Sequence, residues 1–195
     1  MNNNEINNFE KYLEKNPDDY KIRSNLAFLF IKQNLINKAV RQYKIILNKR
    51  EDLQTMFNLG ICYSNLKKFQ ESEKVLNRVI KKNKKHFNAL RALGDISLKQ
   101  EKIKKAYKYL KLAKKINDKD PILLNLLGAL EMKLLNYSEA EKNLLQSLNY
   151  EKNYISPKNN LAILYQKIGK IETEFLLPFF GLKMISSQAL LISSI

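Results

Sequence analysis

Residues 121–150 read PILLNLLGALEMKLLNYSEAEKNLLQSLNY and contain the pair Leu127-Gly128, a large apolar residue followed by a small one. The same kind of pair recurs at Leu26-Ala27, Leu59-Gly60, Leu93-Gly94 and Leu161-Ala162. Successive pairs are 33, 34, 34 and 34 residues apart. A fixed period of this length is typical of a solenoid, in which each repeat is one supersecondary unit that stacks on the next.

Each period contains two helical patterns. In residues 121–150, apolar side chains recur twice at three- and four-residue steps, with a break at Leu135-Asn136. Asp120 followed by Pro121 predicts the start of the first helix, because Asp caps helices well and Pro suits the first helical position. Asn136 with Glu139 three residues later predicts a capping box at the start of the second helix. Two amphipathic helices joined by a short turn form an antiparallel hairpin.

Small residues occupy the positions where the two helices of a hairpin are expected to cross. Gly128 lies on the first helix, and Ala140 is its counterpart on the second. The equivalent pairs are Ala27 and Ala39, Gly60 and Ser72, and Gly94 and Ala106. Because Gly inside a helix costs about 1 kcal/mol relative to Ala, three such glycines predict a close helix crossing that offsets this cost.

With these positions aligned, the chain resembles the tetratricopeptide repeat family over roughly residues 20–170. The family pattern is a large residue, Leu-Gly, an aromatic residue, then Ala, a large apolar residue and Ala. It matches Met56, Leu59-Gly60, Tyr63, Ser72, Leu76 and Val79, and again Leu90, Leu93-Gly94, Ala106, Leu110 and Ala113. The departures are local: Ser97 and Glu131 replace the aromatic residue, and Arg23 and Lys158 replace the first large one. The resemblance implies an all-α, right-handed superhelical solenoid of helix hairpins.

The repeats divide the chain into consecutive segments. Residues 1–19 carry one apolar stripe, at Ile6, Phe9, Tyr12 and Leu13, and are expected to form an N-terminal capping helix rather than a signal peptide. The repeat array is expected at 20–52, 53–86, 87–120 and 121–154, with a partial repeat at 155–170.

Residues 171–195 form a divergent apolar tail. Pro178 falls in the middle of the helix that the repeat register predicts, and Pro there costs about 3 kcal/mol or more. A membrane span needs about 20 uninterrupted apolar residues, and Pro178, Gly181 and Lys183 interrupt this tail. Two interpretations stay open: an irregular C-terminal cap, or a truncated or altered coding end.

The composition is strongly basic, with a net charge of +16. The many lysines and asparagines also fit the codon bias of an AT-rich genome, so the charge has a compositional as well as a functional interpretation. The single cysteine, Cys62, rules out an internal disulfide, and its place within a helix predicts a buried apolar role. We therefore expect a cytoplasmic protein.

No catalytic, metal or cofactor constellation is present in the sequence. The single histidine, His86, lies at a repeat junction, where a solvated loop residue is expected. No Cys/His metal spacing or glycine-rich phosphate loop occurs. The sequence predicts a protein without enzyme activity or cofactor.

The resemblance implies that first helices line a concave groove that binds a peptide. Asn25, Asn58 and Asn160 share one repeat position there, and a row of amides can hydrogen-bond an extended backbone. The basic excess predicts an acidic or carboxylate-terminated ligand, although Ser24 and Phe28 depart from the carboxylate clamp of related co-chaperones. The predicted groove residues are Lys21, Asn25, Phe28, Lys32, Gln54, Asn58, Ile61, Asn65, Asn88, Arg91, Lys99, Asn125, Lys133, Asn159, Asn160 and Lys167.

A second surface is predicted from the charge of residues 81–115, which hold thirteen basic residues against Asp95 and Glu101. It is either a solvated face or a docking site for nucleic acid or another anionic surface. Few aromatic residues accompany it, which argues against reading of bases. The predicted patch is Lys81, Lys82, Lys84, Lys85, Lys104, Lys108, Lys111 and Lys115.

Taken together, these patterns predict a non-catalytic scaffold that binds an extended, acidic segment of another protein. Two alternatives remain at this level. The chain is an accessory repeat region of a larger enzyme or complex, or it is a basic adaptor that docks on nucleic acid through its third repeat.

Overall fold

The computed structural model describes residues 2–169. These residues form helices and connecting turns without any strand among them, which confirms the predicted all-α fold class. The chain divides into two compact units, Met1–Ile116 (unit 1) and Asn117–Ile195 (unit 2). The predicted tail at 171–195 lies outside the described residues.

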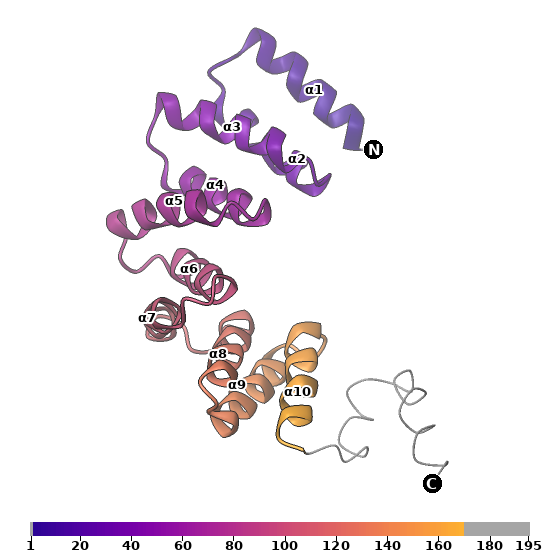
Figure 1. The fold of residues 1–195 in the computed structure, drawn as a ribbon. Coiled ribbons are helices and arrows are strands. Elements are labelled where there is room, and N and C mark those ends of the chain that lie inside the picture. Colours follow the sequence, from indigo (N-terminus) through magenta and orange to yellow (C-terminus); the bar gives the residue numbers. More distant parts are fainter. Residues whose placement is uncertain (1, 170–195) are drawn as a thin grey trace. The chain divides into compact units, whose positions relative to one another are not determined.

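Unit 1 is built from helix hairpins that follow one another along the chain (Figure 1). α2 pairs with α3, α4 with α5 and α6 with α7, and contacts of α3 with α4 and of α5 with α6 join the hairpins. α1 packs against α2, where its Ile6 and Leu13 enter the same apolar core as Phe30. The helices are α1 (Asn2–Lys15), α2 (Tyr20–Lys32), α3 (Ile36–Lys49), α4 (Leu53–Asn65), α5 (Phe69–Lys82), α6 (Phe87–Lys99) and α7 (Ile103–Lys114).

Unit 2 contains α8 (Pro121–Lys133), α9 (Tyr137–Tyr150) and α10 (Ile155–Lys167). α8 and α9 form a hairpin, and α10 contacts both of them. The predicted cap of α8 is confirmed, because Asp120 Oδ1 accepts a hydrogen bond from the Leu123 amide at 2.7 Å. The predicted capping box of α9 is wrong. The Asn136 side chain makes no cap and instead donates to Glu131 Oε2 at 2.8 Å, back toward the end of α8.

The glycines of the repeated pair are places where a leucine from the partner helix fills the space of a missing Cβ. A Cβ built on Gly60 would lie 2.7 Å from Leu76 Cγ, and one on Gly128 would lie 2.6 Å from Leu144 Cγ. Gly94 stands in the same relation to Leu110. The predicted close crossing is therefore confirmed, and each crossing is locked by a leucine within the same hairpin.

A second periodic feature lies in the turn inside each repeat. Positive φ angles of 57° to 69° occur at Asn34, Lys67, Glu101, Leu135 and Gly169, which are again 33 or 34 residues apart. After each of the first four, the next amide bonds to the carbonyl five residues back, as from Leu35 to Phe30 at 2.8 Å. This is the Schellman helix ending, whose left-handed position is usually Gly because other residues are strained there.

Leu135→Gly is therefore expected to stabilise unit 2. The left-handed conformation costs a residue with a Cβ about 1 to 2 kcal/mol, part of which glycine loses again through its unfolded-state entropy. We expect a net gain of about 0.5 to 1 kcal/mol in the free energy of unfolding, measured by urea denaturation, because Leu135 is 68% exposed and little burial is lost. Leu134→Gly is the control: Leu134 has φ −87°, so a gain there would contradict the explanation.

Candidate protein-interaction faces

The predicted groove residues of unit 1 lie on α2, α4 and α6, of which α4 and α6 contact each other directly. We call the solvent-facing side of these three helices the first-helix face. Asn58, Ile61 and Arg91 are half-buried there. The other predicted residues are exposed: Lys21, Asn25, Phe28, Lys32, Gln54, Asn65, Asn88 and Lys99.

Aromatic and cationic side chains occur in pairs one turn apart on this face. Phe28 is 52% exposed, and Lys32 Nζ lies 4.7 Å from its ring centroid. The Arg91 guanidinium lies 5.4 Å from the ring centroid of Phe87. Each pair offers an apolar surface beside a positive charge, which suits a ligand segment that carries both apolar and acidic side chains.

Carboxylates are scarce on the first-helix face. The sequences of α2 and α4 contain none, and α6 contains Asp95 alone. Asp95 Oδ2 pairs with Lys99 Nζ at 2.8 Å, so its charge is compensated within the helix. The electrostatic character of this face is therefore positive.

The asparagines that share one repeat position have different surroundings. Asn25 is exposed, whereas the Asn58 side chain accepts from Gln54 Nε2 at 2.9 Å and also hydrogen-bonds Tyr43. In unit 2, Asn160 Nδ2 donates to Asn125 Oδ1 at 2.8 Å. The row is thus chemically uneven, because two of its members hold hydrogen bonds that a ligand would have to share or replace.

The predicted groove residues of unit 2 lie on α8 and α10. Lys133, Asn159 and Lys167 are exposed, while Asn125 is only 7% exposed because it lies against α10 and accepts the bond from Asn160. The structure therefore places Asn125 inside the helix packing rather than on an open surface.

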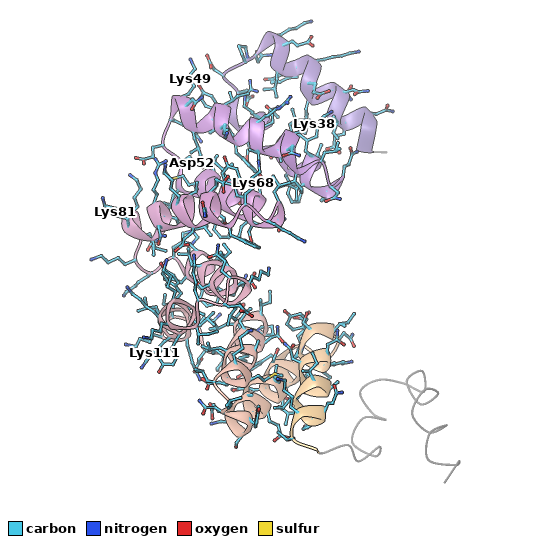
Figure 2. The ribbon with its side chains drawn as sticks, viewed as in Figure 1. Lys38, Lys49, Asp52, Lys68, Lys81 and Lys111 are labelled. Carbon is cyan, nitrogen blue, oxygen red and sulfur yellow. The ribbon has the colours of Figure 1, made fainter. Side chains whose placement is uncertain are left out.

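The predicted lysine patch lies within unit 1. Its residues are all exposed: Lys81, Lys82, Lys84, Lys85, Lys104, Lys108, Lys111 and Lys115. Lys82 Nζ pairs with Glu51 Oε2 at 2.6 Å, and this hydrogen bond lowers the pKa of the Glu51 carboxyl. Figure 2 shows Lys81 on α5 and Lys111 on α7, both pointing to solvent.

The net positive charge of the chain comes from one unit. Residues 1–116 carry 27 basic and 11 acidic side chains, a net charge of +16 (27 minus 11). Residues 117–195 carry 8 of each and are neutral. The whole excess of positive charge therefore belongs to unit 1, although the two units share the same repeat pattern.

The single histidine and single cysteine both have structural roles. His86 is half-buried at the start of α6, where its Nδ1 accepts from the Ala89 amide at 3.2 Å and its ring lies 5.2 Å from that of Phe57. The predicted solvated loop residue is thus a helix cap. Cys62 is fully buried as predicted, and burial raises the pKa of its thiol to about 11, which keeps it protonated and unreactive at neutral pH.

Residues 2–169 contain no group of three or more His, Cys, Asp or Glu side chains placed to hold a metal ion. Over the same residues, none of the helices has the length and apolar character that crossing a bilayer requires.

Two curated proteins are similar in sequence to part of this chain, although no protein-family model matches it. TPR repeat-containing protein MJ1428 of Methanocaldococcus jannaschii is 29% identical over 170 residues, which are 85% of this chain and 28% of that protein. BBSome complex member BBS4 of Bos taurus is 30% identical over 115 residues, which are 59% of this chain and 21% of that protein. The chain thus spans between a fifth and a third of the length of these curated relatives.

Among solved structures, the fold is similar to that of YrrB, a TPR protein with an unusual peptide-binding site. The TM-score is 0.67 at 18% sequence identity, and the match covers 96% of this chain and 98% of YrrB. At this identity the similarity concerns the fold alone.

Proposed function

Because the chain is a tetratricopeptide repeat protein, we propose that it acts as a non-catalytic scaffold that binds an extended, acidic segment of another protein on its first-helix face. The observation that carries the proposal is the composition of that face, where exposed amides and cations meet an exposed aromatic ring, and Asp95 is the single carboxylate of α2, α4 and α6. The peptide-binding site described for YrrB, which shares the fold, supports this choice of ligand class.

Binding on this face needs no chemical step. Two of the helices that carry it, α4 and α6, are packed against their hairpin partners through the close crossings at Gly60 and Gly94, so their backbone is held in place before a ligand arrives. A rigid site leaves most of the ordering entropy to the ligand segment, which limits the cost on the protein side. Amides such as Asn25 and Gln54 can bond a peptide backbone, and the cations then select acidic side chains.

A second candidate role is favoured by the comparison of lengths. The chain matches 28% of the archaeal relative and 21% of BBS4, which is a member of a protein complex. We propose as the alternative that this repeat array serves a larger protein or assembly. In that case the first-helix face would bind a segment of a fellow subunit.

The test is selection of random linear peptides by the full chain, followed by affinity measurement on a synthetic copy of an enriched peptide. We expect enrichment of Asp and Glu together with an apolar residue. Replacing both Phe28 and Lys32 by Ala is expected to weaken binding at least about tenfold, which is 1.4 kcal/mol.

The control is Tyr107→Ala with Lys111→Ala on α7, because this pair has the same four-residue spacing and a cation 5.3 Å from its ring centroid. It should leave peptide affinity unchanged. Equal losses in the two double variants, or enrichment without acidic residues, would contradict the proposal.

A further inference from the structure

The second helices of unit 1 carry more positive charge than the predicted patch includes. α3 and α7 contain no carboxylate, and α5 contains Glu71 and Glu73. The basic side chains of these helices are all exposed: Lys38, Arg41, Lys44, Lys49, Lys74, Arg78, Lys81, Lys82, Lys104, Lys105, Lys108, Lys111 and Lys114. We call this set, with the exposed turn lysines Lys84, Lys85 and Lys115, the outer basic surface.

Side-chain contacts between successive second helices make this surface continuous. Glu51, in the turn after α3, pairs with Lys82 of α5 at 2.6 Å and with Arg78 at 3.5 Å. Glu73 of α5 pairs with Lys105 of α7 at 2.6 Å. These contacts place α5 beside both the end of α3 and α7.

Figure 2 shows Lys49, Lys81 and Lys111, from α3, α5 and α7, along one margin of unit 1. Together with the bridging ion pairs, this placement means that the rows of cations on the three helices adjoin one another. A ligand that crosses from one helix to the next therefore stays close to cations, because Glu51 and Glu73 at the two crossings are each paired with basic side chains.

Few carboxylates lie within this surface to balance its charge. The hydrogen bond from Lys105 is the main cause that lowers the pKa of the Glu73 carboxyl. This carboxylate is therefore already paired within the contact between α5 and α7. Along α7 and its C-cap residue, Lys104, Lys108, Lys111 and Lys115 follow steps of four, three and four, which places them in one stripe. A nucleic acid carries a layer of condensed cations, and it gains entropy by releasing them when such a lysine stripe neutralises its phosphates.

We propose that the outer basic surface binds the phosphate backbone of nucleic acid without reading its sequence. This function is separate from peptide binding on the first-helix face. Eleven of the thirteen helical cations are lysines, which act as point charges, whereas the bidentate forks of arginine favour specific contacts. A nucleic acid carries phosphates at regular intervals along its length, so one strand can meet the rows on all three helices.

The arrangement on α7 suits a nucleic acid better than a bilayer. A helix that lies on a membrane buries an apolar face among the lipid headgroups, and its cations lie on the opposite, polar face. Here lysines occupy the centre of the outward face, and the exposed Tyr107 and Leu112 lie on either side of the stripe. An anionic bilayer would therefore meet the lysines first, with no apolar row at the centre of the face to insert.

The test uses the full chain and a fluorescently labelled oligo-uridine RNA, with binding followed by anisotropy across a range of salt concentrations. We expect the logarithm of the affinity to fall linearly with the logarithm of the salt concentration. Lys104→Gln with Lys108→Gln and Lys111→Gln is expected to weaken binding on the order of 100-fold at ~0.1 M salt and to reduce the slope by about 2.

The control variant removes the same charge from unit 2, with Lys119→Gln, Lys142→Gln and Lys152→Gln. It should leave RNA affinity near that of the unaltered chain, and an oligo-adenosine RNA should bind similarly to oligo-uridine. Three outcomes would overturn the proposal: no RNA binding at low salt, equal losses in both triple variants, or stripe-dependent binding of phosphatidylserine vesicles or polyglutamate but not of RNA. Circular dichroism of both variants verifies that they are folded.

Discussion

Gly94→Val is expected to destabilise unit 1 by about 3 kcal/mol, measured by urea denaturation followed by circular dichroism. A Cβ at this position would already lie 2.6 Å from Leu110 Cγ, and valine adds two further methyl groups. The Leu110 side chain cannot turn toward solvent to relieve this contact, because it is fully buried, as are Ala106 and Ala113 on the same side of the helix. The gain in helix propensity over glycine, below about 1 kcal/mol, does not offset this crowding.

A double-mutant cycle separates crowding from other effects of the substitution. Leu110→Ala alone should cost about 2 to 5 kcal/mol, because it leaves a cavity. Combined with Gly94→Val, it should cost less than the sum of the two single changes, since the valine methyl groups enter that cavity. If the two effects simply add, the destabilisation by Gly94→Val does not come from a clash with Leu110. Asn88→Val, at an exposed position of the same helix, should change stability by less than about 0.5 kcal/mol.

Tyr43→Ala is expected to lower the stability of unit 1 by about 3 to 5 kcal/mol, the largest effect that we anticipate from one side chain. Tyr43 is 1% exposed and occupies the repeat position that Leu76, Leu110 and Leu144 fill elsewhere. Its loss would leave a cavity of aromatic size and remove a hydrogen bond from Asn58. Tyr107→Ala is the matched control, because that ring is 45% exposed and should matter by less than about 1 kcal/mol.

The hydroxyl of Tyr43 adds a dependence on pH. Burial raises the pKa of Tyr43 to about 12, above the value of about 10 for an unfolded chain. The folded state therefore prefers the neutral phenol, and its contribution is complete below pH 10 and is lost as the pH rises toward 12. Tyr43→Phe should flatten the decline in unfolding free energy over this range. The decline will not vanish, because burial also raises the pKa of the Cys62 thiol to about 11.

The repeat architecture could be predicted from sequence because its signals are apolar side chains at fixed spacing. The positions of Leu59-Gly60 and Leu93-Gly94 fix both helix periodicity and the crossing of each hairpin. The positive-φ turn was not predictable in the same way. Its residues are Asn34, Lys67, Glu101, Leu135 and Gly169, and side chains this different carry no common chemical signal. The backbone hydrogen bonds of the helix ending impose the conformation regardless of the residue.

The candidate site was predictable only as a set of positions. Equal places in the repeat suggested equal roles for Asn58 and Asn160, yet their partners differ. Asn58 is bonded to Gln54 one turn earlier and to Tyr43 from the preceding hairpin, whereas Asn160 is bonded to Asn125, 35 residues before it. Such pairings depend on which side chains face each other across helices, and no repeat alignment contains that information.

The glycine–leucine crossings have a consequence for how such a chain can change in length. Each crossing is complete within one hairpin, as in Gly94 with Leu110 and Gly128 with Leu144. A gene duplication that copies residues 87–120 would therefore copy both partners of the crossing, Gly94 and Leu110. The new hairpin would need to adapt only its contacts with the neighbouring hairpins. The first hairpin differs, because Tyr43 stands at the leucine position and hydrogen-bonds Asn58 of the next hairpin. Arrays of this kind can thus lengthen by duplication of internal hairpins, whereas the first hairpin, next to the N-terminal helix, is less suited to being copied.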